Sequence, residues 1–378
     1  MHNLDSQPKY IKILILNYLP LRSLLKVSQL NKTYYKLVKH SDPVVWDQYT
    51  NFDNLFQKMK WKLCYYMSNT YHHNFHIKEN YKKYLMAKVI PIFTTYDIND
   101  NTNYHNVDYL MPKFLHSQFK NLLVVKYHAS LKTNIDTVNI PISIDKDKFG
   151  FYAKFINNYI NDNDKYHNQV MTNICDTYKY GNLFDYLKEN SRSMSVEIWI
   201  SILFQAFFNL ALIQSKYPSF KHNDFKASNI YLGEDPNYID NTDNIDNYAS
   251  CRLPGQKFRI KRSKFLISIH NFQFSSINGI IENSFITENW LKKLNVTSIP
   301  NKYIDIHYFC ISLLYWCKEK YISLPKEIND FLHRVVPKKY RYGSLNVIKK
   351  TLRIIVNDEY TTPYNVIVGD KLFKNIHL

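Results

Sequence analysis

The feature that most constrains this chain is a short polar loop that follows a long apolar segment. The loop contains the pattern H-x-D-x-K-x-x-N, whose fixed positions are His222, Asp224, Lys226 and Asn229. The segment before it, residues 198–213, is too short to cross a bilayer and carries a few polar side chains, so it is expected to be a buried helix. Because its four polar side chains directly follow an expected buried helix, this loop is the candidate site.

The pattern resembles the catalytic loop of protein kinases. The resemblance implies that Asp224 accepts the proton of the substrate hydroxyl and that Lys226 meets the transferred phosphate. It also implies that Asn229 holds a metal ion and that His222 has a structural role.

Segments on either side of the loop resemble the large lobe of the poxvirus late virion kinase family and its large-DNA-virus relatives. They are residues 205–220, 331–341 and 362–374. Residues 302–315 resemble the buried large-lobe helix in which an acid binds the backbone of the catalytic loop, and Asp305 takes that role by position. The alternative for Asp305 is an ordinary carboxylate at a helix N-terminus, stabilised by the helix dipole.

The small lobe that this resemblance implies, residues 89–178, has lost its usual phosphate-binding features. Strands are expected at 89–93 and 122–127 and a helix at 147–160, but the first glycine is Gly150, after both strands, so a glycine-rich loop is excluded. No Glu occurs between positions 79 and 189 to pair with a strand lysine. Lys126 is the candidate for that lysine, and a solvent-facing lysine is the alternative reading.

The metal position is also altered. An expected strand at 265–269 leads into Asn271 and Phe272, where kinases have a metal-binding Asp followed by Phe. Phe272 would keep the packing role, but an amide offers Mg2+ a neutral oxygen in place of a charged one. The resemblance therefore implies that ATP and Mg2+ bind weakly or not at all, through Lys126, Asn229 and Asn271.

The first fifty residues carry a second resemblance. Apolar residues at three- and four-residue steps over 8–49 predict short helices, each with one buried face. Their order resembles the F-box, although Gln7 and Tyr10 depart from that family, and an unrelated three-helix bundle is the alternative. The resemblance implies docking onto the Skp adaptor of a cullin-RING ubiquitin ligase. The implied interface residues are Pro8, Ile11, Leu19, Pro20 and Leu21.

Composition sets limits on the remaining function classes. The net charge of +17 is spread along the chain with no compact basic motif, so binding to nucleic acid is a weak third class. The five cysteines lack metal-site or disulfide spacing, and no signal peptide is recognised, so we expect a soluble intracellular protein, in the host cytoplasm or the virion, with no membrane partner.

These observations predict an α+β chain with a three-helix F-box and a two-lobed protein-kinase-like fold whose second lobe is mainly helical. The expected domains are the F-box at 1–50, a helical connector at 51–88, a degenerate small lobe at 89–178 and a large lobe at 179–378; within the last, 233–262 is expected to be a polar loop. The losses favour a pseudokinase that acts as a viral F-box adaptor, recruiting a target protein to the ligase. The alternative is an active Ser/Thr protein kinase with Asp224 as base.

Overall fold

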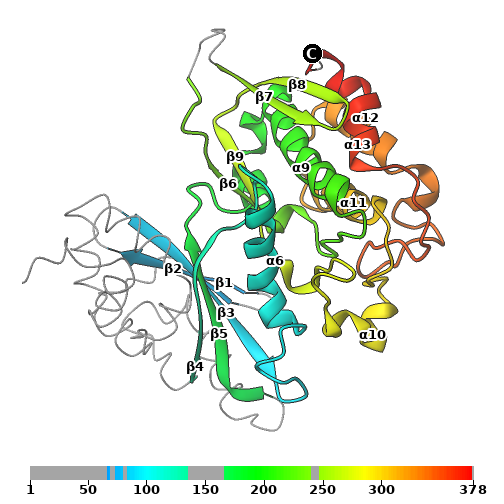
Figure 1. Cartoon of the computed structure of the whole chain (residues 1–378). Helices are drawn as coiled ribbons and strands as arrows, with labels where there is room; N and C mark the ends of the chain where they lie inside the picture. The colour runs from blue at the N-terminus through cyan, green and yellow to red at the C-terminus, as the bar shows by residue number, and fades with distance from the viewer. Residues whose placement is uncertain (1–65, 69–72, 80–82, 135–165, 240–246, 377–378) are drawn as a thin grey trace, which may run out of the picture. The chain divides into compact units, whose positions relative to one another are not determined.

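The computed structural model describes two compact units of the chain (Figure 1). The described residues are 66–68, 73–79, 83–134, 166–239 and 247–376. Within them, the first unit comprises the residues up to Tyr96 and Tyr127–Thr177, and the second comprises Asp97–Lys126 and the residues from Tyr178 onward. The expected small lobe at 89–178 is therefore not one compact unit, because residues 97–126 pack with the later part of the chain.

The first unit is built on a five-stranded antiparallel sheet of order β1-β2-β3-β5-β4. The strands are β1 (Tyr66–Ser68), β2 (His73–Glu79), β3 (Lys83–Phe93), β4 (Tyr127–Asn134) and β5 (Tyr166–Asp176). β3 lies between β2 and β5, and successive residues on it, from Met86 to Ile90, are buried, as a central strand covered on both faces requires. The sheet confirms that the chain combines strands with helices.

The helical connector expected at 51–88 is wrong for its described part. β1, β2 and the first half of β3 occupy it. The apolar run of β3 continues through Pro91, where the pairing with β5 becomes irregular before Phe93. Proline is tolerated at such irregular strand positions but would break a helix, so the local chemistry favours the strand.

Residues 97–126 of the second unit contain a helix that the sequence did not predict, α6 (Tyr104–Gln118). The expected strand at 122–127 is wrong: Val124 makes a single parallel bridge to Ile269, and the N–H of Val125 donates to the Ile269 carbonyl at 2.8 Å. Because this apolar run pairs only with the last residue of β9, it lacks the hydrogen-bond partners that a full strand needs. The helix expected at 147–160 lies outside the described residues.

The second unit is mainly helical, as the resemblance implied. Its longer helices are α8 (Leu183–Asn190), α9 (Val196–Lys216), α11 (Tyr303–Glu319), α12 (Lys326–Val335) and α13 (Pro363–Gly369). Its short helical turns are η3 (Ser191–Ser193), η4 (Ala227–Asn229), η6 (Phe272–Phe274), η7 (Ser284–Thr287), α10 (Asn289–Lys292), η8 (Lys338–Tyr340) and η9 (Lys371–Ile376). Its strands are β6 (Ile230–Glu234), β7 (Tyr248–Leu253), β8 (Gln256–Lys261) and β9 (Phe265–Ile269), paired as β6 with β9 and β7 with β8.

The expected buried helix is α9. Its N-terminus is capped by Ser195, whose side chain accepts a hydrogen bond from the N–H of Ile198. Phe204 and Phe207 project from it into an aromatic core, where Phe207 packs edge to face on Phe309 of α11. Within the described residues α9 is the one helix long and apolar enough to cross a membrane, and 61% of its most apolar window is buried inside the unit. That burial is typical of a core helix.

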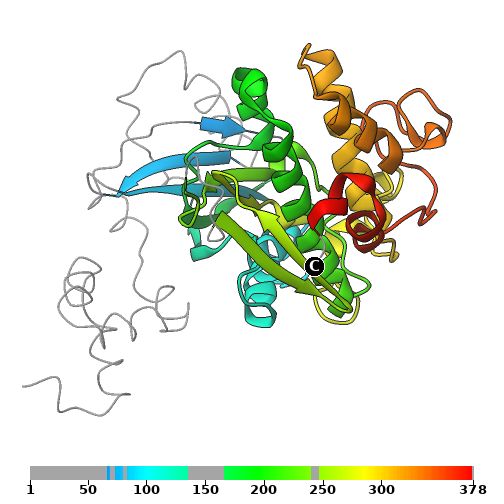
Figure 2. The same cartoon turned by 90° about the horizontal axis from the view of Figure 1, so that it is seen from above.

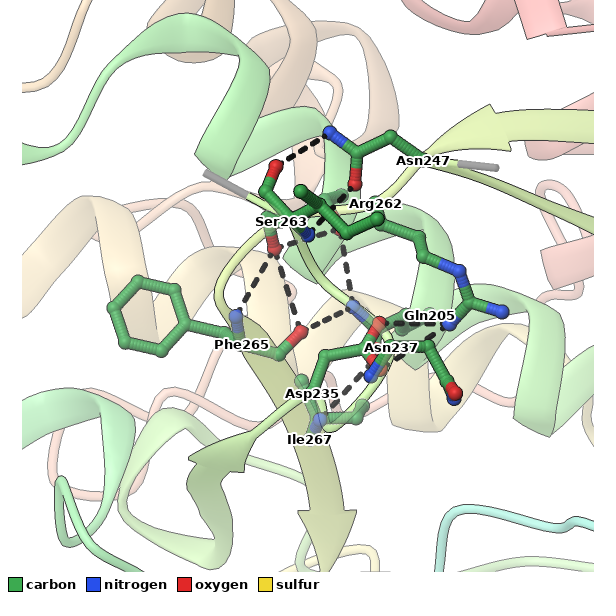
Figure 3. Close-up of polar contacts among 10 residues, drawn as sticks. Gln205, Asp235, Asn237, Asn247, Arg262, Ser263, Phe265 and Ile267 are labelled. Atoms are coloured by element: carbon green, nitrogen blue, oxygen red, sulfur yellow. Dashed lines mark hydrogen bonds and ion pairs between the residues drawn. The ribbon is translucent and has the colours of Figure 1, made fainter. Parts of the chain in front are cut away.

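Polar side chains of α9 bind the edge of β9 (Figure 3). The Oε1 atom of Gln205 accepts the N–H of Ile267 at 3.0 Å, and its Nε2 donates to the carbonyl of Phe265 at 3.0 Å. One amide thus satisfies two backbone groups of a strand edge, which would otherwise be buried without partners. Because β9 leads directly to Asn271, the hydrogen bonds of Gln205 fix the strand that ends beside this candidate metal-binding residue.

The polar segment 233–262 is not a loop throughout, contrary to expectation. Its second half forms the hairpin β7–β8, whose register pairs Cys251 with Phe258 and whose turn contains Gly255 in the left-handed region at φ 76°. Phe258 is fully buried and packs edge to face on Phe204 of α9. Figures 1 and 2 show the hairpin beside α9 in both views. Leu253 and Ile260 of the hairpin are buried as well, so apolar side chains from both strands hold it on the core.

Candidate active site

The backbone of the loop at 221–229 is held by Asp305, in the first turn of α11. Its two carboxylate oxygens accept the N–H groups of His222, at 2.7 Å, and of Asn223, at 2.9 Å. Asp305 is completely buried, and Asn223 has a left-handed backbone with φ 61°. The structure therefore places Asp305 in the position that the sequence predicted, and both of its carboxylate oxygens accept hydrogen bonds from the loop.

Asp224 is the centre of the site, with a side chain that is 4% exposed. Its Oδ2 atom accepts hydrogen bonds from the amides of Asn229, at 2.8 Å, and Asn271, at 3.1 Å, and lies 3.1 Å from Lys226 Nζ. Its Oδ1 atom accepts a hydrogen bond from Arg353 Nη2 at 3.1 Å. The three predicted loop residues and the predicted metal-position residue thus meet at one carboxylate, together with an arginine.

The surrounding charges keep Asp224 ionised. Burial alone raises the pKa of its carboxyl, but the cations Lys226 and Arg353 outweigh burial and hold the pKa below its usual range. Burial lowers the pKa of His222, whose Nδ1 accepts the N–H of Asp224 and whose Nε2 lies 2.9 Å from the carbonyl of His270. A neutral ring satisfies both contacts, so His222 links the loop to the end of β9, and Asp224 is the ionised carboxylate of the candidate site.

Asn271 and Phe272 lie where β9 ends. Asn271 has a left-handed backbone, φ 68° and ψ 64°, which Asn tolerates better than most residues. Phe272 is fully buried, with its ring 4.7 Å from that of His222. The expected packing of Phe272 under the catalytic loop is therefore present, and Asn271 turns its amide toward Asp224.

The donor set fits a magnesium ion only if the ion arrives with nucleotide phosphates. Within the described residues no group of three or more His, Cys, Asp or Glu side chains could hold a metal ion. Asn229 and Asn271 offer neutral amide oxygens, and the nearest carboxylate, Asp224, already faces two cations. Mg2+ needs negative oxygen ligands, which the phosphates of a bound nucleotide would supply.

Lys126 does not have the position expected of a strand lysine. It precedes β4, and its side chain is exposed, because the run before it is not part of the sheet. Lys88, in contrast, lies at the centre of β3, paired with Asn173 of β5, and is 3% exposed. The signal available from the sequence was the apolar run on both sides of it, Leu85-Met86-Ala87 before and Val89-Ile90 after.

Two further buried charged residues of the second unit were also missed. Asp108 is completely buried on α6, the helix that follows β3 in the chain. Lys221 donates from Nζ to the carbonyl of Thr297 at 2.7 Å, and burial lowers its pKa to about 8. Neither residue stands in a recognisable sequence pattern.

The comparisons with known proteins agree with this geometry. No protein-family model matches the chain. It is 36% identical over 335 residues to "Putative serine/threonine-protein kinase R400" of Acanthamoeba polyphaga mimivirus, which covers 85% of this chain and 70% of that protein. The chain belongs to this viral family of protein-kinase-like proteins. A second relative, "Putative serine/threonine-protein kinase R301" of the same virus, is 24% identical over 185 residues, 45% of each chain.

Membership supports the kinase-like part of the sequence prediction for this viral chain. Protein kinases in general use ATP with Mg2+. The F-box residues Pro8, Ile11, Leu19, Pro20 and Leu21 lie outside the described residues, so the F-box and its adaptor partner stay predictions.

Proposed function

We propose that this kinase-like protein is an active, divergent Ser/Thr protein kinase with Asp224 as the base. The observation that carries the proposal is the state of Asp224: it is buried, ionised and held by donors on both oxygens. A carboxylate held in one orientation can accept a hydroxyl proton without reorganising. A decayed loop would not be expected to keep a buried anion with these partners.

In the proposed reaction, the oxygen of a substrate Ser or Thr attacks the γ-phosphorus of ATP. Its O–H bond breaks and the proton passes to Asp224, while the bond to the bridging oxygen breaks and its electron pair leaves with ADP. Lys226, beside Asp224, neutralises charge on the transferred group. Asn229 and Asn271 would hold the nucleotide-borne metal ion, which supplies further neutralisation of the phosphates.

The losses that favour a pseudokinase lie outside the loop. A Glu partner for a strand lysine, a glycine-rich loop and the metal Asp are absent from the sequence, which favours slow turnover rather than none.

Transfer of labelled γ-phosphate from ATP to a Ser/Thr protein substrate tests the proposal. Wild type should transfer label with Mg2+ or Mn2+, and Lys226→Met should lower kcat/KM for ATP about 100-fold, because the charge that neutralises the transferred phosphate is lost. The matched control is Lys126→Met, which removes the exposed lysine and should leave the rate unchanged. Wild-type protein without transfer would overturn the proposal, and loss of transfer only in Lys126→Met would restore the sequence assignment.

The second candidate function, an adaptor that brings a target protein to a Skp-cullin ubiquitin ligase, rests on the ordered F-box resemblance at 8–46. The full chain should then retain the Skp adaptor in a pull-down, and Leu19→Asp should abolish retention by putting a charge into the apolar interface. Leu345→Asp is the control, because Leu345 is 96% exposed in the second unit. Failure of wild type to retain the adaptor would remove this function without affecting the kinase proposal.

A further inference from the structure

Arg353 reaches the site from a tight turn near the C-terminal end of the second unit. The N–H of Ile348 donates to the Arg353 carbonyl at 2.8 Å, and the amide of Asn295 donates to the Ile354 carbonyl at 2.8 Å. Leu352, directly before the arginine, has a left-handed backbone with φ 64°. These hydrogen bonds to the backbone of the turn therefore fix the position of Arg353.

The guanidinium of Arg353 is itself firmly held. It is 7% exposed, donates from Nη2 to Asp224, and lies 4.2 Å from the centre of the Tyr308 ring. Its Nη1 atom is buried and has no hydrogen-bond partner among the residues that the structure describes. The contact with Asp224 joins positions separated by 129 residues in the chain.

Two features of this arrangement are locally unfavourable. A left-handed conformation at a residue such as Leu costs about 1–2 kcal/mol, and a buried N–H without a partner costs about 1–3 kcal/mol. A residue kept only for stability would not need both. Locally costly features that persist together are typical of functional sites, and here they maintain one contact, that of Arg353 with Asp224.

We propose that Arg353 is a positioning residue for phosphate transfer: it fixes the orientation of the Asp224 carboxylate through Oδ1, the oxygen opposite the one that meets Asn229, Asn271 and Lys226. The inference rests on the kinase activity proposed above. In this chain it compensates for Asn271, since a neutral amide cannot fix the site through a metal ion as strongly as a carboxylate does.

The test compares Arg353→Gln and Arg353→Lys with Arg334→Gln. Arg334 is a matched control, because it forms a two-point contact with Asp370, at 2.8 and 2.7 Å, and plays no part in the site. In Arg353→Gln, kcat should fall about 10- to 100-fold with KM for ATP nearly unchanged.

Arg353→Lys keeps the charge and loses the planar fork. It should recover part of kcat, and it keeps the inference testable if Arg353→Gln folds poorly. An unchanged or increased kcat in Arg353→Gln overturns this inference alone. If wild type transfers no phosphate, the proposed function fails and the inference fails with it.

Discussion

Replacing Asp224 by Asn lowers the rate of phosphate transfer by about a thousandfold, the middle of the range for loss of a general base. Asn keeps the size of the side chain but cannot accept the hydroxyl proton. It also leaves buried Arg353 and partly buried Lys226 without their shared anion, and removing one partner of a buried ion pair costs about 3–5 kcal/mol of folding free energy. Transfer of labelled phosphate, measured at a temperature where circular dichroism shows the variant folded, separates the two effects.

Asp235→Asn is the control for that experiment. Asp235 pairs with Arg262 at 2.8 Å in the same unit (Figure 3), and its side chain is 7% exposed. Asp235→Asn should lose stability and keep its transfer rate. Equal transfer rates for Asp224→Asn and wild type would show that Asp224 is not the base.

Replacing Asp305 by Ala destabilises the second unit by about 4 kcal/mol and abolishes transfer. Two buried N–H groups, those of His222 and Asn223, lose their charged acceptor together, and each such loss costs about 1.5–3 kcal/mol. The alternative role of Asp305, a helix-terminal carboxylate, predicts a loss of only about 0.3–1 kcal/mol. Urea unfolding monitored by circular dichroism distinguishes the two roles by magnitude.

The control for Asp305→Ala is Asp330→Ala, at an exposed pair with Lys326 on α12. An exposed pair of this kind contributes about 0–1 kcal/mol, so this variant should stay close to wild type in stability and rate. If both variants lose the same small amount, the loop is not anchored by Asp305.

The parts of the site that the sequence predicted are those encoded locally. The loop from His222 to Asn229 and the helix before it carry their patterns within thirty or so consecutive residues, and Phe272 follows directly from a recognisable strand. The role of Asp305 was predicted from its position in a motif at the start of a helix. Local patterns of this kind survive divergence because each position has its own packing or hydrogen-bonding requirement.

Lys88 was missed because the expected strand began one residue after it. The apolar spacing of Tyr84 and Leu85 favoured a helix, so the lysine fell into the connector rather than the sheet. Helix α6 was missed because Pro112 lies inside it and its buried positions include polar residues such as Asp108. In both cases tertiary packing decided the structure against the local propensity.

Arg353 was beyond the reach of sequence reasoning for a different reason. Its contact with Asp224 links distant positions, and the left-handed residue before it is Leu352 rather than the Gly or Asn that would have marked a turn. Only a structure can show that this turn meets the catalytic loop.

The amide of Asn271 has a consequence for how the site could have changed over time. Asn271 donates to Asp224 at 3.1 Å, whereas an Asp at this position would set two carboxylates against each other at that distance. Like charges so close cannot both stay ionised without a cation between them. An Asn271→Asp replacement is therefore not a neutral single step: it becomes tolerable only together with a cation bound between the two carboxylates.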